Sequence, residues 1–223
     1  MGSPVYVINP NSSQTVMAAI DRAVAPLRSA DGPDIVCLSL AEGPPGIQSQ
    51  RDVDGVIMPM LRKAAELEED AGAFVIACFS DPGLHALREQ SGRRVFGIAE
   101  CGVLTALTLG QRFGVIAILP TSIPRHLRYF GAMGVLDRFA ADLPIGLGVA
   151  DLSEEDRTLG RMIDVGNTLK TTHGADVLVM GCAGMARYRR ALEQAVGIPI
   201  VEPTQAAVAM AVGHVRLSDA VTA

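Results

Sequence analysis

The sequence of 223 residues lacks several features that mark common classes of protein. It has no tryptophan, and its net charge of −5 includes no run of basic residues. Nucleic acids and anionic membranes are bound through clustered Lys and Arg, so we expect neither as a partner. No apolar run approaches the roughly 18 residues of a membrane-spanning helix, and no basic segment followed by an apolar one opens the chain. We therefore predict a cytoplasmic protein.

Signals for metals, disulfides and cofactors are also scarce. The four cysteines, Cys37, Cys78, Cys101 and Cys182, are widely spaced and form no CxxC pair. This spacing argues against structural zinc and, in a reducing compartment, against disulfides. The histidines show no metal-ligand spacing, and no GxGxxG motif follows the first predicted strand. We predict that the protein uses no metal and no cofactor.

Two of the cysteines end short apolar runs and precede predicted helices. The first run is Phe74-Val-Ile-Ala-Cys78, followed by Asp81-Pro-Gly83, and the second is Val177-Leu-Val-Met-Gly-Cys182. A short apolar run bounded by turn residues is typical of a buried strand. Open α/β sheets bind their ligands at the carboxyl ends of their strands. We therefore expect both cysteines at ligand-binding edges.

The two cysteine segments belong to a longer internal repeat. The cysteines lie 104 residues apart, while Pro10 and Pro120, each after a predicted strand, lie 110 apart. A third pair, Glu100 and Glu202, lies 102 apart, and we interpret these two as helix caps rather than catalytic acids. Three landmarks in one order at similar offsets indicate a duplicated α/β unit.

Strands that alternate with helices predict parallel sheets. We predict an α/β fold with two pseudo-symmetric domains, each with a mainly parallel sheet flanked by helices, and the active site in the cleft between them. Residues 1–98 with 205–223 form the first predicted domain, and 99–204 the second. Within them we predict a helix capped by Ser12 or Ser13, a helix from about Asp54 and a strand at 145–149.

A thiol on each side of one cleft suits inversion at a carbon atom. One thiolate removes a proton from one face, and the opposite thiol donates a proton to the other face. Cysteine has a pKa of about 8.5, and a helix N-terminus lowers it, so both predicted helix starts favour the thiolate. The backbone amides there could also hold the enolate oxygen. These segments contribute four candidate substrate-binding residues: Phe79, Ser80, Ala183 and Gly184.

Neutral donors follow the first strand of each half. Asn9 and Asn11 follow the first predicted strand, and Thr121 follows its counterpart. Amide and hydroxyl groups at the carboxyl edge of a sheet suit the carbonyls of a substrate. We add these three residues to the predicted substrate-binding set.

Four motifs together resemble the aspartate/glutamate/hydantoin racemase superfamily, and within it the hydantoin and allantoin racemase branch. They are Ile8-Asn-Pro-Asn-Ser-Ser13, Ala77-Cys-Phe-Ser-Asp-Pro-Gly83, Gly97-Ile-Ala-Glu100 and Gly181-Cys-Ala-Gly-Met185. The resemblance spans nearly the whole chain. It implies a cofactor-independent racemase with Cys78 and Cys182 as its two bases, a last helix that returns to the first domain, and a homo-oligomer.

The chain also departs from the pattern of the superfamily that it resembles. Amino-acid racemases of the superfamily typically follow their cysteines with Asn-Thr and with Thr-His or Thr-Glu, whereas this chain has Phe79-Ser80 and Ala183-Gly184. The absence of a charged helper at these positions favours a hydantoin- or allantoin-like cyclic ureide, with a carbonyl-activated C–H, over a free amino acid. The segment Val201-Glu-Pro-Thr-Gln205 differs from the Ile-Asp-Gly pattern of hydantoin racemases, which leaves the substrate open.

Four alternatives follow. The chain could be an aspartate- or glutamate-type racemase, or a maleate isomerase with a nucleophilic cysteine. It could be an arylmalonate decarboxylase, although these enzymes keep only the equivalent of Cys182. A two-lobed binding protein would need the cleft but not the thiols.

Overall fold

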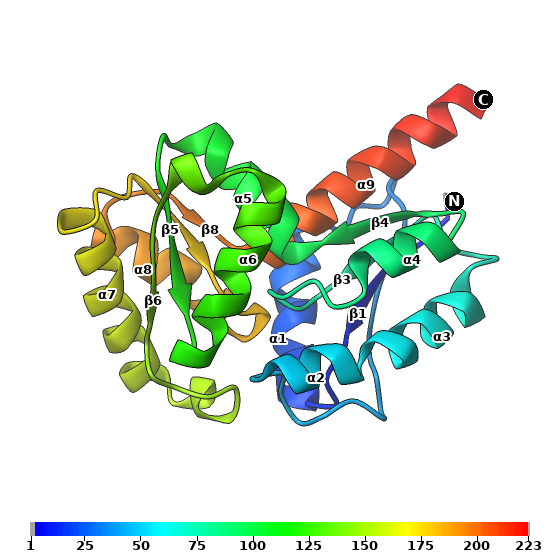
Figure 1. The fold of residues 1–223 in the computed structure, drawn as a ribbon. Helices are drawn as coiled ribbons and strands as arrows, with labels where there is room; N and C mark the ends of the chain where they lie inside the picture. The colour runs from blue at the N-terminus through cyan, green and yellow to red at the C-terminus, as the bar shows by residue number, and fades with distance from the viewer. Residues whose placement is uncertain (1–2, 223) are drawn as a thin grey trace.

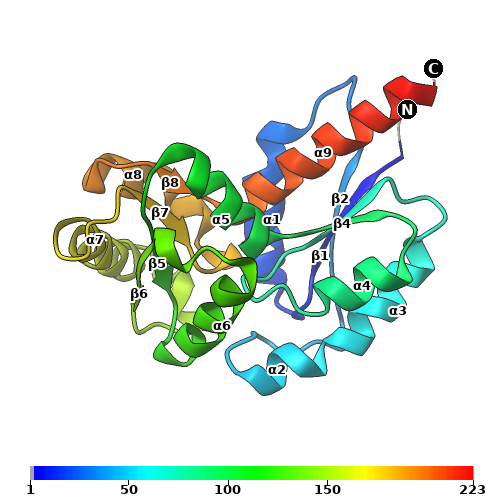
Figure 2. The same ribbon diagram turned by 45° about the horizontal axis from the view of Figure 1, so that its top comes forward.

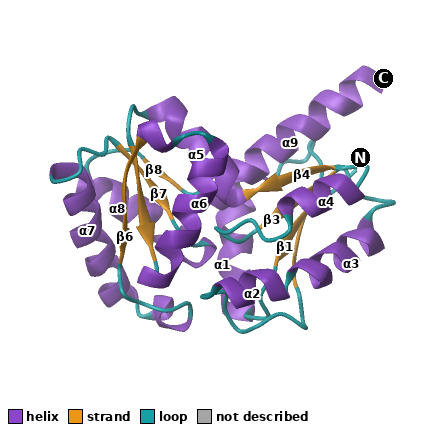
Figure 3. Cartoon of the chain, viewed as in Figure 1, coloured by secondary structure: helices purple, strands orange, loops and turns teal. Residues whose placement is uncertain are grey.

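The computed structural model describes residues 3–222 and contains two four-stranded sheets. The strand orders are β2-β1-β3-β4 and β6-β5-β7-β8, and every neighbouring pair is parallel. Helices flank both sheets (Figure 3). The predicted α/β fold with two parallel sheets is confirmed.

The strands of the first sheet are β1 (Val5–Asn9), β2 (Ile35–Ser39), β3 (Ala73–Ile76) and β4 (Arg94–Gly97). Its helices are α1 (Gln14–Val24), α2 (Gln50–Gly55), α3 (Ile57–Leu67) and α4 (Leu84–Gln90). The strands of the second sheet are β5 (Phe113–Ala117), β6 (Phe139–Pro144), β7 (Val177–Met180) and β8 (Ile200–Val201). The remaining α-helices are α5 (Ile98–Leu109), α6 (Ile123–Met133), α7 (Glu155–Thr171), α8 (Arg189–Val196) and α9 (Pro203–Thr222). No helix among residues 3–222 is both long enough and apolar enough to cross a membrane.

The two sheets repeat the same topology, with the first and third strands of each half at the centre (Figure 1). The central strands β3 and β7 are buried at every residue. Parallel strands that are covered on both faces read as continuous apolar runs, which is why the two cysteine segments could be recognised. Cys78 and Cys182, predicted to be equivalent in the repeat, follow β3 and β7, which occupy the same place in the two sheets.

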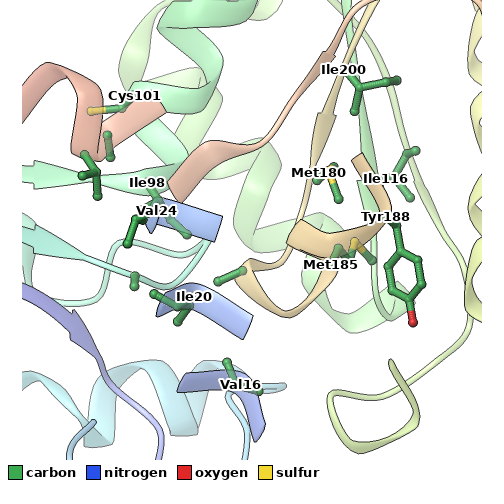
Figure 4. Close-up of a cluster of buried hydrophobic side chains, with 14 of the residues drawn as sticks. Val16, Ile20, Val24, Ile98, Cys101, Ile116, Met180, Met185, Tyr188 and Ile200 are labelled. Carbon is green, nitrogen blue, oxygen red and sulfur yellow. The ribbon is translucent and has the colours of Figure 1, made fainter. Parts of the chain in front are cut away.

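One hydrophobic core extends from the first sheet to the second. Val16, Ile20 and Val24 of α1 belong to the same buried cluster as Met180 and Met185 of the second half (Figure 4). The helix α1 packs against the 3₁₀ helix Ala183–Tyr188, and α9 packs against α5, β3 and β4. The predicted domain boundaries stay a prediction, and residues 1, 2 and 223 of that division lie outside the described residues.

The predicted strand at 145–149 is wrong, because β6 lies earlier, at Phe139–Pro144. This strand is at the edge of its sheet and is mostly half-buried, so it lacks the apolar run of a central strand. Ile145, Leu147 and Val149 are buried although they belong to a loop. Their apolar character therefore reports burial under the second sheet's edge rather than strand structure.

Two helix boundaries also differ from the prediction. The helix expected from about Asp54 is two helices, α2 and α3, which meet at Val56. After Cys78 the chain makes a turn, and α4 begins only at Leu84 because Gly83 adopts a left-handed conformation with φ of 73°. After Cys182 a 3₁₀ helix begins at once. The two cysteines are therefore not equivalent in their distance from a helix N-terminus.

Ser13 is the N-cap of α1, and its Oγ accepts a hydrogen bond of 3.3 Å from the amide of Val16. We expect Ser13→Ala to lower the free energy of unfolding by about 1 kcal/mol, because the amide loses its partner. Ser12→Ala is the matched control and should change it by less than about 0.5 kcal/mol. Urea unfolding of the three proteins measures both effects. Equal losses for the two variants would contradict the assignment of the cap.

Candidate functional site

Cys78 and Cys182 line one pocket. Each lies two residues beyond the end of a central strand, Cys78 after β3 and Cys182 after β7. The pocket thus receives one thiol from each sheet. Its other lining residues are Asn11, Val16, Ile47, Ala77, Phe79, Ser80, Ile118, Ser122, Arg125, His126, Val149, Gly181 and Ala183.

Each of the two sulfurs accepts a hydrogen bond from a backbone amide. The amide of Ser80 donates to the sulfur of Cys78, and the amide of Gly184 donates to the sulfur of Cys182. Each donor stands two residues after its cysteine. The sequence predicts a helix start directly after each cysteine; a 3₁₀ helix begins there after Cys182, whereas α4 starts too late to provide the amide beside Cys78.

The predicted lowering of the cysteine pKa values is wrong. Burial raises the pKa of Cys78 to about 12, although the Ser80 amide and the Arg125 guanidinium act in the opposite direction. Burial raises the pKa of Cys182 to about 11 against the effect of the Gly184 amide. Removal from water disfavours a thiolate more than one amide hydrogen bond favours it. Both thiols are therefore neutral at pH 7 in the free protein.

Raised pKa values predict slow alkylation. We expect iodoacetamide to modify Cys78 and Cys182 at pH 7.5 at least roughly a hundredfold more slowly than free cysteine, because the thiolate is the nucleophile. The rate should continue to rise with pH beyond 10. Mass spectrometry of peptides containing each cysteine measures it. A rate that reaches its plateau below pH 9 would show that a thiolate forms readily in the free protein.

The predicted substrate-binding residues divide into two groups. The first group comprises the four residues that line the pocket: Asn11, Phe79, Ser80 and Ala183. The second comprises those that do not: Asn9, Thr121 and Gly184. Asn9 and Thr121 do not line the pocket, so their substrate-binding role stays a prediction, and Gly184 reaches the site only through its amide, which donates to the sulfur of Cys182.

Asn9 and Thr121 have structural partners instead. The Nδ2 of Asn9 donates to Oδ1 of Asn11 and to Oγ of Ser39, both at 3.0 Å. Thr121 is exposed, and its hydroxyl donates to the carbonyl oxygen of Gln48 at 3.1 Å. The 3₁₀ helix Pro120–Ser122 turns the chain so that Ser122, one residue later, lines the pocket.

The structure adds a cation and an imidazole that the sequence prediction missed. Arg125 and His126, in the first turn of α6, both line the pocket. The Nδ1 of His126 lies 2.6 Å from Oδ2 of Asp142, and both side chains are almost fully buried. The residues that follow the cysteines carry no charge, as the sequence indicates, but charged groups enter the pocket from elsewhere in the fold. Arg125 and His126 come from the helix after β5, and Asp142 comes from β6.

Two signals could have identified these residues. Arg125 and His126 open the α-helix that follows β5, a central strand equivalent to β1 in the first half. Asp142 is a charged residue inside a strand, and a buried carboxylate needs a partner. Among residues 3–222, no group of three His, Cys, Asp or Glu side chains is placed to hold a metal ion.

The pocket holds a volume of only about 30 Å³. That volume is enough for one or two water molecules. Pockets that hold small organic molecules are about ten times larger or more, so the walls must move apart before such a molecule can bind.

Comparisons with known proteins identify the family of the chain. A family model described as Asp/Glu/Hydantoin racemase matches residues 5–211. The chain is 34% identical over 212 residues to a hydantoin racemase of Pseudomonas sp. (strain NS671), across 93% of this chain and 84% of that protein. It is 32% identical over 220 residues to a hydantoin racemase of Rhizobium meliloti, across 93% and 86% of the two chains.

A solved structure gives the same result. The allantoin racemase from Klebsiella pneumoniae superposes with a TM-score of 0.87 at 30% identity, across 96% of this chain and 88% of that one. Sequence and fold thus agree over nearly the full length of the chain. The chain belongs to the Asp/Glu/hydantoin racemase family and is an isomerase, a racemase of that family.

Proposed function

We propose that the protein racemises a hydantoin- or allantoin-like cyclic ureide without a cofactor, with Cys78 and Cys182 as the two bases. The observation that carries this proposal is the placement of the two thiols on one pocket, each delivered by the central strand of a different sheet. Inversion needs one group on each face of the reacting carbon. The duplicated fold supplies such groups in equivalent positions.

In the proposed reaction, the thiolate of one cysteine removes the proton from the ring carbon that bears the substituent. The electron pair of the C–H bond moves onto the adjacent carbonyl, whose oxygen becomes an enolate. The opposite thiol then donates its proton to the other face of the carbon, and the carbonyl is restored. The first cysteine ends as a thiol and the second as a thiolate, so the next turnover runs in the reverse direction.

Asn11 is suited to hold the enolate oxygen. Its Oδ1 accepts from Nδ2 of Asn9 at 3.0 Å and from the amide of Ser13 at 2.9 Å. Its Nδ2 makes no hydrogen bond to any residue in the part of the chain that the structure describes, and Asn11 lines the pocket. Asn9 thereby becomes a positioning residue, because it fixes which end of the Asn11 amide faces the substrate. A donor preorganised in this way stabilises charge that develops in the transition state.

The two thiols form a coupled pair in this mechanism. Negative charge on Cys182 raises the pKa of Cys78, so one thiolate and one thiol coexist more readily than two thiolates. The mechanism requires this singly ionised state. Because both pKa values lie well above 7, the active fraction grows as the pH rises, and kcat/KM should increase through at least pH 9.

An amino-acid racemase of the aspartate or glutamate type is the second candidate. The observation in its favour is the presence of Arg125 and His126 in the pocket, since a charged substrate needs charged partners. The apolar wall of Val16, Ile47 and Val149 favours the less polar ureide. The names of the relatives, hydantoin racemase and allantoin racemase, favour the ureide as well.

A panel of single enantiomers in deuterated buffer tests the proposal. It contains allantoin, 5-substituted hydantoins, aspartate and glutamate, assayed after chelation and without pyridoxal phosphate or nicotinamide. We expect loss of optical rotation and exchange at the stereocentre for at least one ureide and for neither amino acid. Turnover that is abolished by the chelator and restored by a divalent ion would contradict the cofactor-independent mechanism.

The homo-oligomer implied by the resemblance stays a prediction. We propose that a second copy packs against exposed apolar side chains of α5 and α9, namely Leu104, Leu109, Met210 and Leu217.

A further inference from the structure

A groove beside the pocket lies between the two halves of the molecule. It has a volume of about 490 Å³ and is bordered by α2, by the turn after Cys78 with the start of α4, and by α6. Figures 1 and 2 show α6 of the second half opposite α2 and α4 of the first. Phe79, Ser80, Arg125 and His126 line both the pocket and the groove. The groove therefore joins the place where the thiols lie.

Arg125 stands at this junction with much of its hydrogen-bonding capacity unused. Its Nη1 donates to the carbonyl oxygen of Thr121 at 2.8 Å, and an Nη2 donor lies 3.4 Å from Oγ of Ser122. Its Nε is buried and has no partner. An unpaired buried donor is costly, and a guanidinium offers five donors in a planar fork. The guanidinium is thus incompletely satisfied in the free protein.

No carboxylate of the described residues neutralises Arg125 by an ion pair. The charge of Asp52 acts on Arg125, but Oδ2 of Asp52 accepts from the amides of Gln48 and Ser49. Asp81, on the groove wall, accepts hydrogen bonds from two amides and from Tyr129. These two acids are therefore already engaged, and Arg125 has no carboxylate partner among the described residues.

We propose that Arg125 forms a subsite for a negatively charged group on the substrate, so that the preferred cyclic ureide carries a carboxylate at the end of its substituent. This inference rests on the proposed function. The ring occupies the pocket between the thiols, and the substituent extends into the groove past Phe79. Arg125 binds the carboxylate where the two spaces meet, since charged donor and acceptor form hydrogen bonds about twice as strong as neutral ones.

Arg125 could instead serve only the thiolate of Cys78, which its charge favours. The two roles differ in what they predict. If Arg125 stabilises the thiolate of Cys78, its replacement should lower kcat/KM equally for every substrate, because each substrate needs the same base. If Arg125 binds the substrate, its replacement should lower kcat/KM only for substrates that carry the negative charge.

The test compares two hydantoins of equal size, 5-(2-carboxyethyl)hydantoin and its neutral amide, 5-(2-carbamoylethyl)hydantoin. For each enzyme the readout is the ratio of kcat/KM for the acid to that for the amide. We expect a ratio of about ten or more in the wild type, falling to about one or below in Arg125→Gln. Arg125→Lys keeps the charge and should retain part of the preference. Arg62→Gln removes an equal charge at an exposed, remote ion pair with Glu42 and should leave the ratio unchanged.

The outcomes distinguish a substrate subsite at Arg125 from a role of Arg125 beside the Cys78 thiolate. A wild-type ratio near one overturns the subsite, and this measurement does not depend on whether any variant folds. Equal losses on acid and amide in Arg125→Gln, with the ratio preserved, also overturn it and assign Arg125 to the Cys78 thiolate. Arg128 of α6 also lines the groove, where it donates to Oε1 of Gln50 at 2.7 Å. Loss of the ratio in Arg128→Gln, but not in Arg125→Gln, would assign the carboxylate to Arg128 and overturn the proposal. If the wild type exchanges neither of these hydantoins but does exchange another ureide of the panel, the subsite alone is overturned; if it exchanges no ureide, the proposed function falls and the subsite falls with it.

Discussion

Cys78→Ser and Cys182→Ser should each lose racemisation by roughly a thousandfold or more, since a serine hydroxyl is a far weaker base than a thiolate. The replacement is nearly isosteric, so the fold should be kept. Loss of optical rotation of a hydantoin or allantoin enantiomer measures the effect. Cys37→Ser is the matched control, because Cys37 is a half-buried thiol on β2 that does not line the pocket.

Each variant should still exchange one hydrogen with solvent. The surviving thiolate can remove a proton from its own face and return one from solvent without inverting the carbon. We expect Cys78→Ser to take up deuterium in one enantiomer, and Cys182→Ser to take it up in the other. Proton NMR of each pure enantiomer in deuterated buffer measures this exchange.

Other mechanisms give different patterns. In a nucleophilic isomerase, one variant would be inactive and the other only slowed. A covalent adduct would form on the essential sulfur. A decarboxylase depends on Cys182 alone, and its substrate loses mass. Exchange into both enantiomers by either single variant would contradict the assignment of one cysteine to each face, even for a confirmed racemase.

Sequence reasoning located the central strands and the thiols because their signals are local. The strands β3 and β7 are covered on both faces, so each reads as an apolar run that stops at its cysteine. The edge strand β6 has no such run and was misplaced. Thr121 was chosen in place of Ser122 because nothing in the sequence reports the direction of a 3₁₀ turn.

Residues that depend on contacts between the halves were harder to predict. Arg125 and His126 reach the pocket only because α6 packs opposite the Cys78 turn, and no periodicity in the sequence encodes that arrangement. The paired glutamates were expected to cap helices in both halves. Glu202 does so, since its carboxylate accepts from the amides of Thr204 and Gln205. In the first half the prediction is wrong, because Glu100 pairs with Arg88 and another residue caps α5.

That residue is Asp81, in the turn after Cys78. Its carboxylate accepts from the amides of Ala99 at 3.0 Å and Glu100 at 2.9 Å, and from the hydroxyl of Tyr129 at 2.8 Å. It therefore ties the Cys78 turn to α5 and α6. Gly97 leaves room for it, because a Cβ there would lie 2.2 Å from Oδ2 of Asp81. The residue is almost fully buried, and burial raises its pKa to about 7 against the effect of the three hydrogen bonds.

We expect Asp81→Ala to lower the free energy of unfolding by about 3 kcal/mol, since it leaves two amides and a hydroxyl without partners. Tyr129→Phe removes one of the three hydrogen bonds and should cost about 1 kcal/mol. Urea unfolding measures both, and circular dichroism before unfolding checks that each variant is folded. A loss for Asp81→Ala no greater than that for Tyr129→Phe would show that the amides of α5 do not depend on Asp81.

The loss caused by Asp81→Ala should also depend on pH. An acid whose pKa is higher in the folded protein than in the unfolded chain binds its proton more tightly in the fold. The stability that this proton contributes is complete below about pH 4, near the ordinary pKa of 3.8, and is lost as the pH rises through about 7. The difference in unfolding free energy between wild type and Asp81→Ala should therefore shrink from pH 4 to pH 7.5. A difference that grows over this range would show that the three donors outweigh burial and hold the pKa of Asp81 below its ordinary value.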